Sequence, residues 1–393
     1  MLLGLVGKPS SGKSTFFKAA TMAEVAIASY PFTTIKSNHG IGYVKIDCVD
    51  QELGVKCNPS HGFCIQDKRF VPVEIMDVAG LVPGASKGKG LGNQFLDDLR
   101  QADVFIHIVD ISGTTDSEGK QTENHDPSKD VEFLEDELDK WFFNILMKAW
   151  KSFAKKADVE DNFSKAIVKQ FSGLKVNEEH VKDILAKNTF PEKAGMWSSE
   201  QLMKFASALR KKSKPVIIAA NKIDMEQSKE NYEKLKEKFP DMIIIPCSAD
   251  SELALREASK ANLIEYVSGE NYVKVTGKLN EKQKLALEKI KENVLDRFAS
   301  TGVQAVLNYA VFELLRYIAV FPVDSANKLT DSKGKFLPDC FLLPKESTAL
   351  DFAYFLHTDF GKNFIKAIDA RTKKILGKEY ELKDRDILEI VTR

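Results

Sequence analysis

The sequence predicts an α/β fold: a doubly wound sheet of the P-loop type, with a helical insertion and a C-terminal β-grasp domain. Three observations support this fold class. Strand-like apolar runs alternate with helical patterns from residue 1 to about 117 and again from about 211 to 275. A long amphipathic helical pattern lies between these two blocks. A short pattern of strands around one helix closes the chain.

The first strand-like run, residues 2–6, leads into a loop that fits G-x-x-x-x-G-K-[ST] at residues 7–14. Backbone N–H groups of such a loop surround nucleotide phosphates, and its glycines let the main chain approach without a Cβ. The run STFFKAATMA predicts a helix whose positive end faces the anion. The nucleotide-binding residues expected here are Gly7, Lys8, Pro9, Ser10, Ser11, Gly12, Lys13, Ser14 and Thr15.

Lys13 and Ser14 of this loop, together with residues at the end of the next strand, are expected to bind the phosphates and Mg²⁺. Lys13 is expected to act catalytically by neutralising the β- and γ-phosphate oxygens, and the Ser14 hydroxyl to ligate Mg²⁺. The run FVPVEIMD ends at Asp77, which can hold Mg²⁺ through water. The N–H of Gly80, three residues later, is expected to meet the γ-phosphate and to contribute to catalysis.

A threonine is needed between these two motifs to complete Mg²⁺ coordination and to contact the γ-phosphate from a loop. The segment ASYPFTTIKSNHG offers Thr33 and Thr34. Thr34 is favoured as the catalytic and metal-binding residue, because the chain enters the next strand just beyond it.

A later strand, PVIIAANKID, ends in Asn221, Lys222 and Asp224. A carboxylate such as Asp224 accepts two hydrogen bonds and matches the adjacent N1 and N2 donors of guanine, which adenine lacks. The next strand ends at Ser248 and Ala249, where a backbone N–H can read guanine O6, although a plain turn is an equal alternative for this pair. The order of these motifs predicts GTP as the substrate.

The motifs, together with YPFTT, DVAGLVPGASKGKGLGNQFLDDLRQAD and HIVD, resemble those of Obg-type GTPases, particularly the YchF-like (Obg-like ATPase) branch of archaea and eukaryotes. The tail from FLLPKESTALDF to ILEIV resembles a TGS domain, a β-grasp module shared with threonyl-tRNA synthetases and SpoT-type enzymes. The resemblance implies a Mg²⁺-dependent GTPase that produces GDP and phosphate as a translation-associated switch. It further implies that the TGS domain and the helical insertion contact the ribosome or RNA.

Three features of this chain depart from related patterns. Leu81 follows Gly80 where Ras-like proteins carry a catalytic glutamine, so another group must orient the attacking water. Ser10 stands where relatives often carry an asparagine that helps to coordinate potassium, which leaves potassium stimulation open. The Asn221–Asp224 motif is intact, whereas YchF proteins proper replace it with one that permits ATP.

The domains expected are a G domain over residues 1–275, a helical insertion within it over 118–210, linking helices over 276–317 and a TGS domain over 318–393. The insertion is expected either to pack on itself or to contact a partner. One linking helix is expected to pack on the main body through Leu285, Ile290, Leu295 and Phe298. The amphipathic seam of the insertion comprises Val131, Leu134, Leu138, Trp141, Ile145 and Ala149.

The composition sets limits on partners and location. Lysine plus arginine and aspartate plus glutamate both number 57, so no global charge attracts nucleic acid or an anionic membrane. No apolar run reaches membrane-spanning length, and a strand stands where a signal peptide would lie. We therefore expect a cytoplasmic monomer that does not bind membranes. A P-loop kinase, an RNA-binding scaffold with structural nucleotide and an ATP-using relative are the alternatives.

Two further clusters leave their roles open. Cys57, His61 and Cys64 have the spacing C-x3-H-x2-C, with Cys48 upstream, and either buried thiols or a metal site explains them. His107, inside FIHIVD, is expected to be a packed strand residue. In the tail, either a phosphate-binding patch or a solvated face explains the basic residues Lys333, Lys335, Arg371, Lys373, Lys374 and Lys378.

Overall fold

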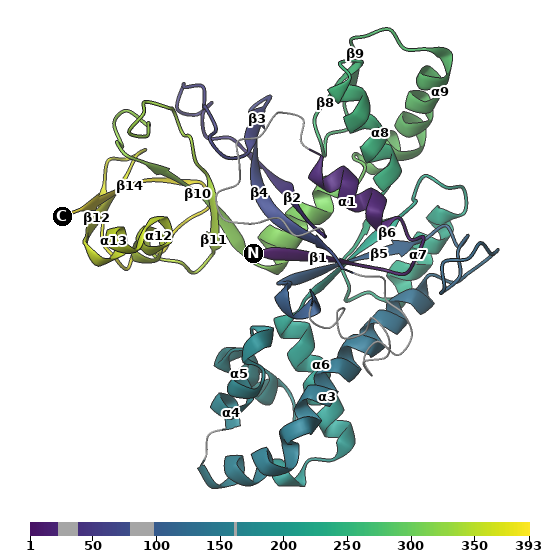
Figure 1. Cartoon of the computed structure of the whole chain (residues 1–393), viewed down its shortest axis with the longest axis vertical. Coiled ribbons are helices and arrows are strands. Elements are labelled where there is room, and N and C mark those ends of the chain that lie inside the picture. Colours follow the sequence, from purple (N-terminus) through teal and green to yellow (C-terminus); the bar gives the residue numbers. More distant parts are fainter. Residues whose placement is uncertain (23–37, 79–97, 161–162) are drawn as a thin grey trace.

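The computed structural model describes residues 1–22, 38–78, 98–160 and 163–393, which form a central sheet, a helical arm and a C-terminal domain (Figure 1). The central sheet has seven strands in the order β2-β4-β1-β5-β6-β7, with β3 beside β4. Neighbouring strands from β4 to β7 are parallel, whereas β2 and β3 run antiparallel to β4. The doubly wound α/β sheet is thus confirmed. Its strands are β1 (Leu2–Val6), β2 (His39–Asp47), β3 (Phe63–Ile65), β4 (Lys68–Asp77), β5 (Val104–Asp110), β6 (Val216–Asn221) and β7 (Ile244–Pro246).

The strands at the centre of this sheet are buried on both faces, as expected for parallel strands between helices. Every residue of β1 and β5 is buried. Leu3 and Leu5 belong to the same core as Phe16 of the first helix, whereas Leu2 and Val6 belong to the core of the helical arm. This alternation follows from the two-residue period of a strand. It places helices on both faces and leaves the carboxyl ends of the strands free for a ligand.

Helices α1 and α8 contact each other beside the central sheet, and α11 contacts α1, β2 and β6. Leu285, on the linking helix α9, is 54% exposed, so the expectation that it packs on the main body is wrong. Helix packing there depends on the next two turns, where Val294 and Leu295 are buried. The elements are α1 (Lys13–Thr21), α7 (Ser228–Lys238), α8 (Ala249–Lys260), β8 (Ile264–Tyr266), β9 (Val273–Val275), α9 (Glu281–Ile290), α10 (Asp296–Phe298) and α11 (Val303–Asn308).

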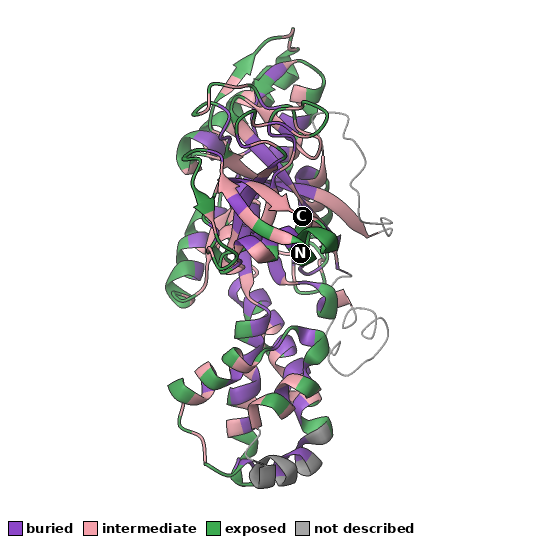
Figure 2. Cartoon of the chain, turned by 90° about the vertical axis from the view of Figure 1, so that its left-hand side faces the viewer, coloured by how far each residue is buried: buried purple, intermediate pink, exposed green. Residues whose placement is uncertain are grey.

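The helical arm projects from one edge of the molecule, and its core is continuous with one face of the central sheet (Figures 1 and 2). Aromatic rings fill this core; Trp150 and Phe163, for example, both contact Trp197. The guanidinium of Arg210 joins two helices of the arm by ion pairs to Glu135 and Asp139. Much of the amphipathic seam of α3 is therefore buried against the other helices of the arm. Its helices are α3 (Ser128–Glu160), α4 (Phe163–Gln170), α5 (Glu178–Lys187) and α6 (Ser199–Ser213).

The C-terminal domain is a five-stranded mixed sheet in the order β11-β10-β14-β12-β13 with two short helices, which confirms the β-grasp expectation. Thr348 and Asp351 form a reciprocal capping box at the start of the first helix. Strand β11 begins at Phe341, and the carbonyls of Leu337 and Pro338 just before it accept hydrogen bonds from Arg69 instead of joining a ladder. The elements are β10 (Tyr317–Val323), β11 (Phe341–Pro344), α12 (Ala349–Leu356), α13 (Thr358–Lys362), β12 (Phe364–Asp369), β13 (Ile375–Leu376) and β14 (Asp386–Thr392).

Candidate nucleotide-binding site

The carboxyl ends of the parallel strands meet at one edge of the central sheet, which is where open α/β sheets bind ligands. The loop after β1, the end of β4, the loop after β5 and the motifs after β6 and β7 all reach this edge. The structure thereby brings together segments from residues 7, 77, 110, 221 and 248 onward.

The loop at residues 7–12 has the backbone that its glycines predict. Gly12 has φ +90°, and a Cβ there would lie 2.2 Å from the side-chain nitrogen of Asn221. A Cβ on Gly7 would lie 2.7 Å from the carbonyl oxygen of Ile108. No side chain of the described chain caps the N-terminus of α1 at Gly12, so its first N–H groups are available to an anion.

The phosphate-side charges lie next to each other. The ammonium group of Lys13, at the start of α1, forms an ion pair with the carboxylate of Asp77 at the end of β4. Ser14 is exposed and Thr15 is half-buried on the first turn of the same helix. The first turn of α1 thus carries an ammonium group and a hydroxyl, and the ammonium group contacts a carboxylate at the end of β4. These are the kinds of group that could bind a Mg²⁺-bound triphosphate.

On the base side, Asn221 joins two loops that are far apart in the sequence. Its Nδ2 donates to the carbonyl oxygen of Ser11 at 2.9 Å, and its Oδ1 accepts from the N–H of Ala249 at 3.0 Å. The side chain is buried, so both bonds are shielded from water. Asn221 therefore fixes the phosphate loop relative to the loop that follows β7.

Asp224 lies at the same edge and is half-buried. Its Oδ1 accepts a hydrogen bond of 2.7 Å from the hydroxyl of Ser248, whose oxygen is also 2.8 Å from the Ser251 hydroxyl. The N–H of Ser248 donates to the carbonyl of Thr301 at 2.8 Å. Because the N–H of Ala249 is engaged with Asn221, the expected reading of guanine O6 by this turn stays a prediction.

Family profiles match three parts of the chain: "50S ribosome-binding GTPase" over residues 2–146, "Obg-like GTPase YGR210-like, G4 motif-containing domain" over 219–325 and "TGS domain" over 320–392. An uncharacterised GTP-binding protein of Methanocaldococcus jannaschii is 49% identical over 100% of this chain and 99% of the relative. This chain belongs to the YchF-like family of P-loop GTPases.

Other relatives agree with this assignment. An uncharacterised GTP-binding protein of Schizosaccharomyces pombe is 37% identical over 89% of this chain and 88% of its own length. The ribosome-binding ATPase YchF of Buchnera aphidicola is 28% identical over 98% and 97%. A crystal structure of a GTP-binding protein from Pyrococcus horikoshii is 41% identical, covers 100% of both chains and has a TM-score of 0.79.

The structure of this YchF-like GTPase adds Asp110 to the site, at the end of β5. Its Oδ2 is 2.7 Å from the Lys222 ammonium nitrogen, and the hydroxyls of Ser112 and Thr115 donate to its carboxylate. Burial disfavours the carboxylate, but the hydrogen bonds from Lys222, Ser112 and Thr115 outweigh burial and lower the pKa of Asp110. The sequence signal for this residue was its place at a strand end, in HIVD, as for Asp77.

Lys8 has a different partner from the one that the sequence suggested. Its ammonium nitrogen lies 2.9 Å from the Asp130 carboxylate and donates to the Thr115 carbonyl at 2.7 Å. Asp130 belongs to the first turn of α3. Lys8 thus links the phosphate loop to the helical arm, and its role as a nucleotide ligand through the side chain stays a prediction.

Three expected residues lie outside the described part of the chain: Thr34, Gly80 and Leu81. His107 is buried on β5, beside Val6 of β1, which confirms a packed strand histidine. Burial lowers its pKa to about 3, with a contribution from the nearby Lys8 cation. His107 is therefore neutral at physiological pH and adds no charge beneath the phosphate loop.

Proposed function

We propose that this protein binds Mg²⁺–GTP at the carboxyl edge of its central sheet, hydrolyses it to GDP and phosphate, and acts as a nucleotide-dependent switch on the ribosome. The observation that carries the proposal is the Asn221 bridge, which connects the phosphate loop to the turn at Ser248 and Ala249. This bridge places Asp224 at a fixed position relative to the phosphate loop, as recognition of one particular base requires.

Ser14, Asp77 and, from the sequence, Thr34 would hold Mg²⁺, which would neutralise the charge of the phosphate oxygens. The ion pair between Lys13 and Asp77 supports this assignment, because it holds the carboxylate next to the first turn of α1. When a triphosphate binds, the Lys13 ammonium is expected to turn from Asp77 to the phosphate oxygens. Lys13 and Asp77 would therefore pair with each other in the free protein and contact the phosphates and Mg²⁺ in the bound protein.

Guanine is proposed over adenine because of Asp224. Its carboxylate has a second oxygen beyond the one bonded to Ser248, and a carboxylate can accept the N1–H and N2–H donors of guanine side by side. Adenine has no such donor pair, so the carboxylate would gain no hydrogen bonds from it beyond the one from Ser248. Relatives at 28% identity are named ribosome-binding ATPases, which makes ATP the alternative substrate.

Hydrolysis is expected to be slow without a partner. Leu81 offers no hydrogen bond to the attacking water, so main-chain groups, the metal-bound Thr34 or a partner must orient it. A partner that supplies an electrostatic group can raise such a rate by about 10³–10⁵. Acceleration on binding a partner is therefore the proposed mode of control.

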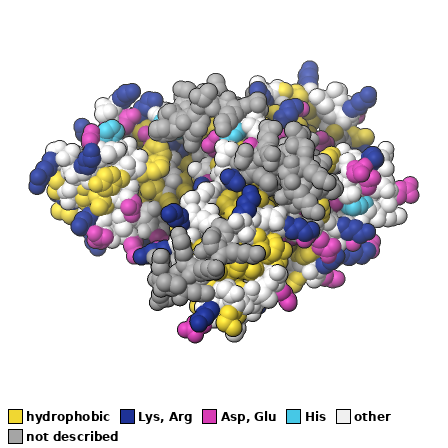
Figure 3. Space-filling view, turned by 60° about the horizontal axis from the view of Figure 1, so that its bottom comes forward, with side chains coloured by type: hydrophobic (Ala, Val, Ile, Leu, Met, Phe, Trp, Pro, Cys, Tyr) yellow, Lys and Arg dark blue, Asp and Glu magenta, His cyan; other side chains and the backbone are white. Residues whose placement is uncertain are grey.

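The ribosome is proposed as that partner from the names of relatives, including the ribosome-binding ATPases, and from the TGS domain. Charge by itself gives weaker support. Arg371 pairs with Glu52, Lys373 donates to the carbonyls of Ala326 and Ala370, and basic and acidic side chains are mixed over the face shown in Figure 3. The remaining basic side chains of the tail would form a local contact in the cytoplasm rather than a broad basic surface.

The test uses the purified full-length chain. Binding of labelled GTP and ATP is measured first, and then phosphate release with and without purified ribosomes. The proposal expects preference for GTP, Mg²⁺ dependence that Ser14→Ala weakens, and faster hydrolysis with ribosomes. Equal affinity for ATP would contradict the base assignment. Ribosome binding without any hydrolysis would favour the scaffold, and phosphate transfer to an added acceptor would favour a kinase.

A further inference from the structure

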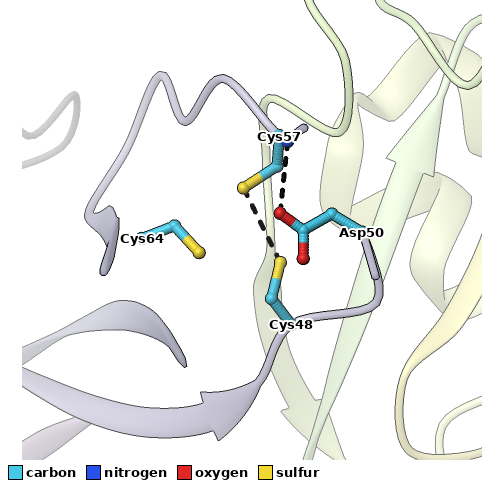
Figure 4. Close-up of side chains that lie close together, drawn as sticks. All are labelled: Cys48, Asp50, Cys57 and Cys64. Atoms are coloured by element: carbon cyan, nitrogen blue, oxygen red, sulfur yellow. Dashed lines mark hydrogen bonds between the residues drawn. The ribbon is translucent and has the colours of Figure 1, made fainter. Parts of the chain in front are cut away.

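A second cluster of chemically active side chains lies near the end of the β2–β4 strand pair that is opposite to Asp77. Cys48, Asp50, Cys57 and Cys64 place four ligand atoms within 4.8 Å of one another (Figure 4). They come from the end of β2, the turn after it, the following loop and β3. His61, in the same loop, instead contacts the Asp339 carboxylate at 2.7 Å.

The geometry of the cluster matches a tetrahedral metal centre. The Sγ atoms of Cys48 and Cys57 are 3.7 Å apart. A tetrahedron with Zn–S bonds of about 2.3 Å has sulfur atoms about 3.8 Å apart, whereas a disulfide requires about 2.05 Å. Three thiols and one carboxylate supply four ligands, which fill a tetrahedral coordination shell without an open position.

Asp50 is an independent sign of a bound cation. Its carboxylate is buried and faces Cys48 and Cys57 (Figure 4). The carboxylate accepts hydrogen bonds from the backbone N–H groups of Gln51 at 3.0 Å and Cys57 at 3.3 Å, and within the described residues no lysine, arginine or histidine forms a salt bridge with it. A buried carboxylate that forms no ion pair is costly, and a cation among the thiolates would offset this cost.

We propose that Cys48, Asp50, Cys57 and Cys64 bind one Zn²⁺ ion as a structural site. Thiolate ligands in tetrahedral array select Zn²⁺ over the oxygen-seeking Mg²⁺ and Ca²⁺. Three thiolates and a carboxylate around Zn²⁺ carry a net charge of −2. Arg69, directly opposite Cys64 in the β3–β4 pairing, is fully buried and makes no salt bridge within the described residues, so it supplies a compensating positive charge.

The site would fix the cysteine loop against the C-terminal domain. The N–H of Asn58 donates to the Phe336 carbonyl, and the N–H of Ser60 donates to the Pro338 carbonyl, both at 2.8 Å. Arg69 also bonds the Pro338 carbonyl at 2.8 Å. Since Asn58 and Ser60 follow Cys57 in the same loop, and Arg69 lies opposite Cys64, the metal would hold together the interface between the central sheet and the TGS domain.

The first experiment measures zinc in the full-length protein by mass spectrometry of the metal after purification without chelator. About one zinc per chain is expected. Cys57→Ser should lose at least nine-tenths of it, whereas Cys340→Ser, which removes a buried thiol outside the cluster, should keep it. Zinc far below one per chain in the wild type, or zinc retained in Cys57→Ser, would overturn the proposal.

A second measurement does not depend on the folding of a variant. Wild-type protein is stripped of metal under reducing conditions and titrated with Co²⁺, and the visible absorption of tetrahedral cobalt–thiolate should appear at one equivalent and vanish when Zn²⁺ is added. Amide hydrogen exchange at residues 335–340 should be faster in the stripped protein and slow again with Zn²⁺. No cobalt–thiolate band, or a Cys48–Cys57 disulfide in protein purified without reductant, would show buried or redox-active thiols instead.

Discussion

The two ends of the nucleotide site are built in different ways. At the base end, Asn221 bridges two loops, Ser248 holds Asp224, and Lys222 is paired with the buried Asp110. At the phosphate end, the central contact is a single ion pair between Lys13 and Asp77, both of which also belong to the expected chemistry. The base end is thus fixed by a network of hydrogen bonds, whereas the ion pair at the phosphate end joins two groups that would contact the nucleotide and its metal instead of each other.

This difference has a physical consequence for binding. A fixed network costs little further ordering when the base binds, so it favours specificity. An ion pair that must exchange partners couples nucleotide binding to a local change in structure, as a switch requires. We therefore expect substitutions at the phosphate end to affect affinity for every nucleotide, and those at the base end to affect discrimination between bases.

The largest effect is expected from Lys13→Ala. This change removes the cation that contacts several phosphate oxygens, and we expect GTP affinity to fall by about 3 kcal/mol or more, roughly a hundredfold or greater. The measurement is titration with a labelled GTP analogue. Lys18→Ala is the control, because Lys18 is on the same helix but is exposed and pairs with Glu257. Unchanged affinity in Lys13→Ala would remove the loop from the site.

Asp224→Ala should affect the opposite end. The preference for GTP over ATP is expected to fall by several kcal/mol, that is, by roughly a hundredfold or more, because the acceptor of the guanine N–H groups is lost. Affinities for GTP and ATP are compared in the wild type, the variant and Asp241→Ala, an exposed aspartate in the loop before β7. If the preference survives in Asp224→Ala, base recognition lies elsewhere.

Asn221→Ala should weaken both ends together, because it removes the bridge between Ser11 and Ala249. The two buried partners lose a hydrogen bond each, at a cost of about 1–3 kcal/mol in stability or GTP affinity. Thermal unfolding with and without GTP separates these two effects. A loss confined to GTP discrimination, with stability unchanged, would show that the bridge does not couple the ends.

The smallest effect concerns His107 beneath the phosphate loop. Its folded pKa is lowered from 6.5 to about 3, so on acidification the unfolded chain takes up a proton that the folded chain does not. Stability should therefore fall as pH drops below 6.5, by about 1 kcal/mol between roughly pH 6 and 5. Urea unfolding of the wild type and His107→Gln at these pH values measures it. An equal slope in both proteins would mean that His107 titrates normally when folded.

The sequence by itself determined the fold class, and it predicted most of the candidate nucleotide site. Spacing alone predicted the phosphate loop at residues 7–14, because glycine at fixed positions and a following helix are local requirements that do not depend on the rest of the chain. Asp77, Asn221 and Asp224 were predicted for a related reason: they lie at or just after strand ends, and parallel strands end at one edge. The same logic, applied to HIVD, would have found Asp110.

The tertiary structure decided what depends on contacts between distant residues. Lys8 lies inside the phosphate loop, but its ammonium pairs with Asp130 of the helical arm, a partner that no local pattern reveals. Leu285 fits the helical apolar spacing, yet it is exposed, and burial in this region falls instead on Val294 and Leu295. The proposed metal site likewise depends on contacts that the sequence does not reveal. Spacing grouped His61 with the cysteines, but in the structure His61 contacts Asp339, and Asp50 lies among the cysteines instead. The reason is that ligand geometry depends on side-chain direction rather than on order in the chain.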